Sequence, residues 1–325
     1  MPAPIAFLDL SICPPVLATI ILKKSRRSVR VSPYFTGARG YCRIISAPPV
    51  RGVTGITDGG NMRSPYLTAF AILSLCLAAA PGAGAYDWKA GTSLNYDTGK
   101  YGTGTRTDSI YIPLTLTRYY TGGQVSLTVP WLRQSSSGAV TRVGGSPVRA
   151  SRNVEGASGA VSGAESGLGD VLLRGTYAIK EESLHRFDLA FAGSLKFPTA
   201  NEKKGLGTGE IDQGAGLEFA KEMSGSWTLL IDGYYTIIGD PEGVDYDNQV
   251  TLDIGFYREL REDLSVTALY VTRSALVSGN SDQREATGTL VRTMPDGDQF
   301  SAGLLLGLSE GSPQLGLSVG FARRF

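Results

Sequence analysis

Charged side chains recur between apolar residues from residue 86 onward, and they offer the first candidate chemistry. If these stretches are extended strands, eight such side chains point to the face opposite the apolar one. They are Lys89, Arg174, Asp188, Lys196, Glu218, Asp232, Asp253 and Glu285. Charges on an inner face survive only beside water or opposite charges. The pattern predicts either a polar pore whose charges select solutes or an interior filled by ion pairs, and both alternatives stay open.

A glycine-rich segment at Gly205, Gly207 and Gly209 raises the question of phosphate binding. A nucleotide-binding loop needs a Lys followed by Ser or Thr, and a helix whose N-terminus faces the phosphates. The sequence has neither at this point. We therefore interpret the segment as a loop between strands, which either folds inward as a constriction or turns outside.

Four acids crowd another predicted loop and suggest a cation site. They are Asp240, Glu242, Asp245 and Asp247. Carboxylate oxygens suit Ca²⁺, but the spacing is not that of an EF-hand loop, and acids on a surface loop usually remain solvated. We predict no metal site and no cofactor.

An enzymatic function is not predicted. Ester or peptide cleavage commonly needs a histidine as general base, and the chain contains a single one, His185. It stands beside Glu181 and Glu182 in a predicted short turn, where a histidine is usually solvent-exposed. No residue is therefore assigned a catalytic role.

The elements that position these residues are strands, because apolar side chains recur at every second residue from Trp88 onward. No stretch has the period of an amphipathic helix. Twelve strands are predicted, at 88–96, 110–116, 125–131, 171–179, 187–197, 215–219, 227–237, 250–256, 264–270, 286–290, 300–308 and 315–321. Pro113 and Pro130 each remove a backbone donor from a strand, so the register is least defined there.

Connection lengths distinguish a membrane barrel from a water-soluble sandwich. Short connections at 120–123, 180–185, 221–226, 259–263 and 293–298 alternate with mostly longer ones at 97–107, 132–166, 198–211, 239–247 and 273–284. Short periplasmic turns and longer outer loops give this asymmetry, and aromatic residues gather at both ends of the apolar faces. We predict an all-β fold, an antiparallel transmembrane β-barrel of about twelve strands. The segment 132–166 is either a lid over its mouth or a mobile surface segment.

The first 85 residues differ from the rest. They hold nine Lys and Arg against two Asp, and all three cysteines, whereas residues 86–325 hold 22 basic and 28 acidic residues. Arg63, the apolar run 67–80 and the small residues 83–85 predict a signal peptide over 62–85, cleaved before Tyr86. We interpret residues 1–61 as an unstructured extension upstream of a wrongly chosen start codon, and 86–325 as the barrel.

The C-terminus predicts a location and partners. Ser318, Gly320 and the terminal Phe325 resemble the signal read by outer-membrane assembly machinery, although Arg323 stands where that signal usually has an apolar residue. We expect the outer membrane of a Gram-negative bacterium, with the lipid bilayer, lipopolysaccharide and the assembly machinery as partners. A net charge of +1 gives no basis for nucleic-acid binding.

Two motif strings in the centre of this region point to a known family. They comprise GLGD, with Gly167, Gly169 and Asp170, and KFPT followed by GLGTG, with Pro198, Thr199, Gly205, Gly207, Gly209 and then Asp212. Together they resemble the MetA-pathway-of-phenol-degradation family of outer-membrane barrels, often labelled transporters. The resemblance implies passage of small solutes, including small aromatic or hydrophobic compounds, and supplies no catalytic residues. The alternative is a non-conducting structural or adhesive barrel.

Overall fold

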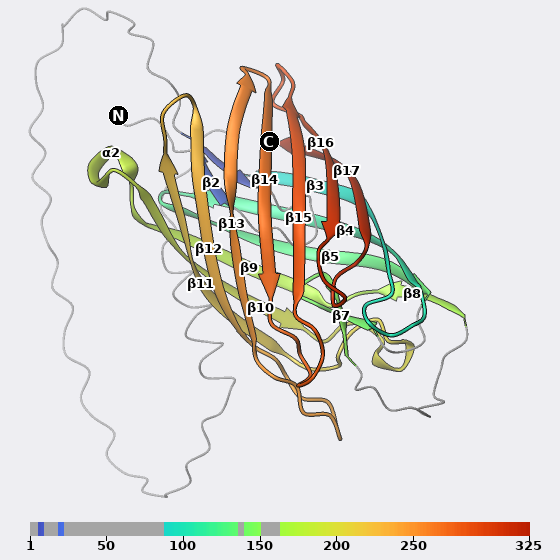
Figure 1. Cartoon of the computed structure of the whole chain (residues 1–325). Helices are drawn as coiled ribbons and strands as arrows, with labels where there is room; N and C mark the ends of the chain where they lie inside the picture. The colour runs from blue at the N-terminus through green and yellow to red at the C-terminus, as the bar shows by residue number, and fades with distance from the viewer. Residues whose placement is uncertain (1–5, 10–18, 23–87, 136–139, 151–162) are drawn as a thin grey trace, which may run out of the picture.

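Twelve long strands close into one antiparallel barrel in the computed structural model, which describes residues 6–9, 19–22, 88–135, 140–150 and 163–325 (Figure 1). The strands are β3 (Trp88–Gly99), β4 (Thr107–Tyr120), β5 (Gly123–Ser135), β9 (Val171–Lys180), β10 (Asp188–Phe197), β11 (Asp212–Glu222), β12 (Trp227–Ile237), β13 (Gln249–Arg261), β14 (Leu264–Arg273), β15 (Gln283–Thr293), β16 (Gln299–Gly307) and β17 (Leu315–Arg324). Each pairs with its neighbour in the chain, and β17 closes the ring on β3. The predicted fold is confirmed.

Several short elements accompany the barrel. They are β6 (Val140–Val143), β7 (Ser146–Arg149), β8 (Ala164–Leu168), the helix α2 (Glu182–His185) and the 3₁₀ turn η1 (Glu202–Lys204). Upstream, β1 (Ala6–Asp9) and β2 (Thr19–Leu22) pair antiparallel in a separate sheet. The signal peptide at 62–85, its cleavage site and most of residues 1–61 lie outside the described residues, so these assignments stay predictions.

Alternation sets the two faces of the wall. In β13, Ile254 is 39% exposed while its neighbour Asp253 is 1% exposed. The same contrast recurs around the ring, where large exposed side chains include Leu94, Leu114, Leu217, Ile231, Leu290, Leu304 and Val319. Because a closed barrel has no free sheet edge, this outer apolar surface can lie against lipid while every strand remains hydrogen-bonded.

The two ends of the barrel differ as predicted. Tight turns join the strands at the upper end of Figure 1, and longer connections lie at the lower end. Aromatic side chains meet near the short-turn end, where Trp227 lies edge-on to Phe256 with ring centroids 6.0 Å apart and Phe300 packs on Phe321 at 5.2 Å. These pairs occupy the position of an interfacial aromatic belt.

The two prolines of β4 and β5 lie directly opposite each other. Pro113 is the register partner of Pro130, and the pairing of these strands runs without a shift from Asp108 to Tyr120. Both missing donors therefore fall at one level of the wall. On the other side of β5, Gly169 donates its N–H to the Pro130 carbonyl (2.9 Å), at the point where the partner of β5 changes from β9 to β8.

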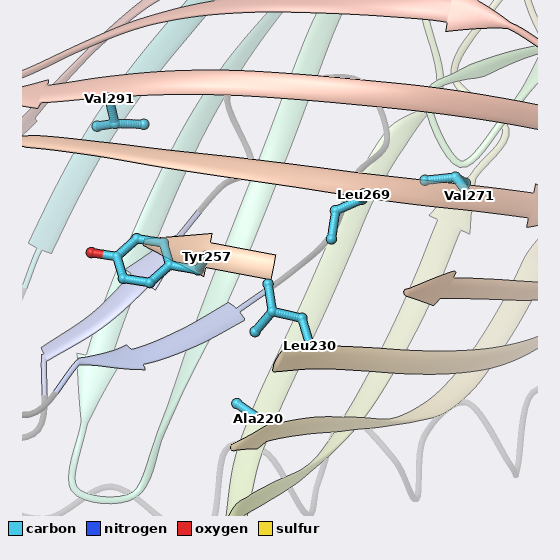
Figure 2. Packing of buried hydrophobic residues seen from close by; sticks show 6 residues of the cluster. All are labelled: Ala220, Leu230, Tyr257, Leu269, Val271 and Val291. Atoms are coloured by element: carbon cyan, nitrogen blue, oxygen red, sulfur yellow. The ribbon is translucent and has the colours of Figure 1, made fainter. Parts of the chain in front are cut away.

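Apolar side chains also point into the barrel, most of them in the half nearer the short turns. Figure 2 shows this inner cluster, formed by Ala220, Leu230, Tyr257, Leu269, Val271 and Val291. Leu230 and Val271 are almost completely buried. A lumen built only to hold water has no need of such a cluster, so this half has an apolar lining along β11–β15.

Candidate functional site

The hairpin β6–β7 lies across the outer mouth of the barrel and is held by a buried ion pair. Arg142 Nη2 donates to Asp97 Oδ2 at 3.1 Å and to Ser109 Oγ at 2.5 Å, which ties the hairpin to β3 and β4. On the opposite side, Gln283 Nε2 of β15 donates to the carbonyl of Pro147 at 2.7 Å. All eight strand residues of the hairpin are buried. This part of segment 132–166 therefore lies over the mouth.

Apolar contacts also hold the hairpin in place over the mouth. Val143 and Val148 pack with Ile238, Leu276 and Val277, which come from two other outer loops. The hairpin thus contacts loops and strands from most of the circumference. It narrows the outer end of the lumen.

The family motif forms a charged network beside the hairpin. Lys196 of β10 lies with its Nζ 2.8 Å from Asp212 Oδ2 and 3.6 Å from Asp170 Oδ2, and it also bonds Thr208. The four side chains are at most 8% exposed. Burial raises the pKa of Asp170 above its ordinary value, although the nearby Lys196 ammonium by itself would lower that pKa. Residues of both motif strings, Asp170 from the first and Thr208 and Asp212 from the second, therefore converge on one lysine.

Close contacts and backbone conformation explain four further motif positions, Gly169, Thr199, Gly207 and Gly209. Thr199 Oγ1 donates to the Gly169 carbonyl at 2.8 Å, and Ala200 N donates to Asp170 Oδ1 at 3.0 Å. A Cβ on Gly207 would lie 2.5 Å from Asp170 Oδ2, so no larger residue fits there without displacing the carboxylate. Gly209 has φ +80°, a conformation that favours glycine.

The glycine-rich loop folds inward. Leu206, between Gly205 and Gly207, is 1% exposed and packs with Tyr111 and Leu132 of the wall. The loop thereby presents Thr208 to Lys196. Of the two directions predicted for this segment, the structure shows the inward one.

A row of acids lies deeper, at one level of the lumen. Strand register places Glu218 opposite Asp232, Asp232 opposite Asp253, and Val271 opposite Glu285. We call Glu218, Asp232, Asp253 and Glu285 the acidic row. All four are at most 4% exposed.

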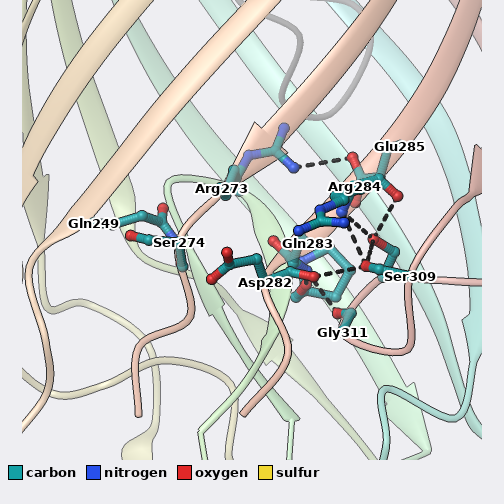
Figure 3. Close-up of polar contacts among 12 residues, drawn as sticks. Gln249, Arg273, Ser274, Asp282, Gln283, Arg284, Glu285, Ser309 and Gly311 are labelled. Carbon is teal, nitrogen blue, oxygen red and sulfur yellow. Dashed lines mark hydrogen bonds and ion pairs between the residues drawn. The ribbon is translucent and has the colours of Figure 1, made fainter. Parts of the chain in front are cut away.

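Two arginines neutralise the ends of the acidic row. Arg174 donates to both Glu218 and the Tyr234 hydroxyl, and its guanidinium carbon lies 5.0 Å from the Tyr234 ring centroid. Arg273 Nη1 donates to Glu285 Oε2 at 2.9 Å, as Figure 3 shows. The middle of the row is different. Both carboxylate oxygens of Asp253 lack a hydrogen-bond partner among the described residues.

The last two predicted residues lie away from this row, near the periplasmic end. Lys89 is the second residue of β3 and is 4% exposed. Asp188 is the first residue of β10, and its Oδ1 accepts from the backbone N–H of Glu182 in α2 at 2.7 Å. The eight candidates therefore occupy three levels: Lys196 at the mouth, five residues around the acidic row, and Lys89 and Asp188 at the inner end.

A cavity of about 140 Å³ lies between the hairpin and the acidic row. Tyr111, Pro113, Leu172 and Leu195 supply apolar walls, and Gly145 of the hairpin closes the outer side. The charged side chains that reach the cavity are Arg174, Lys196, Asp212, Asp253 and Arg273. Mostly apolar walls with a few fixed polar groups are typical of small-molecule sites.

Other candidate sites have ordinary surroundings. Asp240 Oδ1 accepts the backbone N–H of Tyr246 at 2.8 Å, and the described residues contain no cluster of acids, His and Cys suited to a metal. His185 is exposed at the end of α2. Within the described part of the chain, no helix is long and apolar enough to cross a membrane.

Four important residues were not identified from sequence. Tyr234 and Arg273 fall on the inner face when the two-residue alternation is extended along β12 and β14, so the signal was present. Asp97 and Arg142 had no such signal, because their pairing depends on a hairpin that folds back over the mouth.

Comparison with known proteins identifies the family. The family profile described as "Putative MetA-pathway of phenol degradation" matches residues 116–325. The chain belongs to this family. No curated protein sequence matches the chain.

One solved structure shares the fold, and two others are more distantly similar. The COG4313 outer membrane channel from Pseudomonas putida F1 superposes with a TM-score of 0.57 at 16% identity, covering 75% of this chain and 97% of that one. The NanC porin gives a TM-score of 0.46 at 12% identity, covering 73% and 98%. The P. putida toluene transporter TodX gives 0.38 at 13%, covering 75% and 80%. The family member described here is an outer-membrane β-barrel in contact with the lipid bilayer.

Proposed function

We propose that this barrel is a channel that passes small, partly apolar solutes across the outer membrane and has no enzymatic role. The observation that carries the proposal is the order of surfaces along the lumen. A mostly apolar cavity lies under the hairpin, the acidic row follows, and the apolar cluster around Leu230 and Leu269 lies beyond it. A solute with an apolar body meets compatible walls on both sides of a charged level. The family description, which refers to phenol degradation, agrees with small aromatic solutes.

The eight predicted charges fit this function as elements that shape the lumen. The charges at the mouth and at the ends of the acidic row are paired with opposite charges. They therefore fix the shape of the lumen and make its wall rigid, in addition to setting its electrostatic potential. We further propose that assembly machinery recognises Phe325, whose side chain is exposed while its backbone N–H and carbonyl pair with Trp88. Lipopolysaccharide would contact the outer end of the barrel.

The non-conducting barrel is the second candidate, and the hairpin favours it. A plug anchored by Arg142–Asp97 and by Gln283–Pro147 could seal the mouth permanently. A barrel of twelve strands lies between the eight that side chains fill and the sixteen that leave an aqueous channel. Strand number therefore does not separate the two functions.

Single-channel recording separates them. We expect discrete current steps from the protein purified from outer membranes and reconstituted in planar bilayers. The double variant Asp97→Asn/Arg142→Gln removes the charges without leaving either one buried alone, and should raise the open fraction. Lys204→Gln, which breaks an exposed pair with Glu165 (3.0 Å), is the matched control and should behave as wild type. Silence from both the wild type and the double variant would establish the non-conducting barrel.

A further inference from the structure

We propose that the cavity under the hairpin binds a small amine, with its ammonium group on Asp253 and its apolar body against Leu172 and Leu195. The proposal deepens the proposed channel function by naming a class of solute. It rests on an unusual carboxylate, because Asp253 is 1% exposed, lines the cavity, and has no hydrogen-bond partner for either oxygen among the described residues.

The three cations that line the cavity, Arg174, Lys196 and Arg273, are each paired with an acid, and the acidic row at the level of Asp253 favours a cation. Asp232 is the register partner of Asp253, and its Oδ2 also lacks a hydrogen-bond partner within the described chain. Like charges directly opposite on neighbouring strands repel each other. The two arginines at this level, Arg174 and Arg273, bond Glu218 and Glu285. The four acids of the row therefore outnumber these two arginines. One ammonium at Asp253 would reduce this excess.

The walls favour an organic cation over an inorganic ion. A bare metal ion needs several oxygen ligands, whereas much of this cavity is lined by Tyr111, Pro113, Leu172 and Leu195. A cavity of about 150 Å³ with apolar walls accommodates a benzene ring, and this one measures about 140 Å³. A ring or short alkyl chain that carries one aminomethyl group matches both its size and its polarity.

Benzylamine and benzyl alcohol provide a matched pair of probes, because they differ mainly in charge. Calorimetry on the detergent-purified protein should show benzylamine binding at least about tenfold more tightly, since hydrogen bonds between ionised groups are the stronger ones. Asp253→Asn keeps the shape of the side chain and should remove most of this preference. Asp263→Asn, in an exposed turn, should leave both affinities unchanged.

The measured affinities of the probes decide whether the amine site exists. Equal affinity for the two probes in the wild type, or no binding of either, overturns the proposal even if Asp253→Asn does not fold. Phenol binding as tightly as benzylamine would also overturn it, because the site would then recognise a hydrogen-bond donor whether or not the donor carries a positive charge. Binding in detergent needs no current. A silent channel that binds benzylamine would therefore count against the channel function alone.

Discussion

The outer and inner halves of the lumen are built from different chemistry. The outer half contains the hairpin, the Lys196 network and the acidic row, all of which depend on buried ion pairs. The inner half presents the apolar cluster and, beside it, hydroxyl side chains such as Thr267 and Thr289. The same twelve strands and the same alternation thus produce a charged, closed outer region and an inner region that is lined along β11–β15 by apolar and hydroxyl side chains, with Lys89 and Asp188 at its end.

This difference indicates where selection takes place. Ion pairs fix geometry, because a charge buried without its partner is costly, so the outer half holds one arrangement of loops and side chains. Apolar and hydroxyl surfaces impose no such requirement, so a solute can slide along them. We infer that recognition belongs to the outer half and passage to the inner half.

The largest expected effect is at the mouth. Lys196→Met leaves the buried Asp170 and Asp212 without their shared cation, and removing one partner of a buried pair costs about 3–5 kcal/mol. We expect a loss of that size in the free energy of unfolding, measured by urea titration in lipid vesicles. Lys204→Met removes an exposed pair with Glu165 and should change it by less than about 1 kcal/mol. Equal losses would mean that the outer network is not the rigid half.

The second effect concerns the lipid face, which both halves share. Ile254→Arg places a charge at an outward position and should cost about 2–4 kcal/mol near the middle of the membrane. Leu304→Arg should behave alike, and Leu229→Arg should cost less, because Leu229 lies opposite Phe256 in the aromatic belt. The inward control Thr228→Asn should cost far less in the same unfolding measurement. A comparable loss in the control would show that the two faces of β12 are assigned the wrong way round.

The inner half gives a smaller, functional effect. Leu269→Asn keeps the branching at Cγ but replaces two methyl groups by polar atoms, which removes about 50 Å² of apolar contact, worth about 1.3 kcal/mol at roughly 25 cal/mol per Å². Passage of phenol into vesicles should slow about tenfold, while potassium conductance should not fall. Thr267→Ser, at a buried position of β14, serves as the control. If phenol passes at the wild-type rate, the apolar cluster takes no part in passage.

The strands of this barrel were predictable because each residue's environment follows from its neighbours in sequence. Alternation alone places Ile254 outside and Asp253 inside, and loop length alone distinguishes the two ends. The register was least defined at Pro113 and Pro130, because neither strand by itself shows that the two prolines lie opposite each other.

The mouth was not predictable in the same way. Lys196 and Arg174 were predicted only as inward charges, which either line a pore or fill the interior as ion pairs. Asp212, which holds Lys196, was identified only as a motif residue, and its role appears only when three loops meet. The Arg142–Asp97 pair joins residues 45 positions apart through a returning hairpin. Long-range contacts of this kind depend on loop conformation, which no two-residue period encodes.

The smallest expected effect is at the periplasmic end, where a charge pair joins β17 to the turn before β16. Arg323 donates two hydrogen bonds to Asp298, from Nε to Oδ1 at 2.8 Å and from Nη2 to Oδ2 at 2.5 Å. These bonds lower the pKa of Asp298, so the pair stabilises the fold above the ordinary Asp pKa of about 3.9 and is lost as pH falls through the lowered value. Because the Arg323 side chain is 59% exposed, water and salt screen the pair strongly. We expect Arg323→Leu to leave the thermal midpoint at pH 7 and physiological salt unchanged within error, with a slight decrease only at low salt. That decrease should vanish below the lowered pKa, where the wild type also lacks the pair. A clear loss of stability at pH 7 and physiological salt would mean that the inner half, too, depends on ion pairs, and the contrast between the halves would not hold.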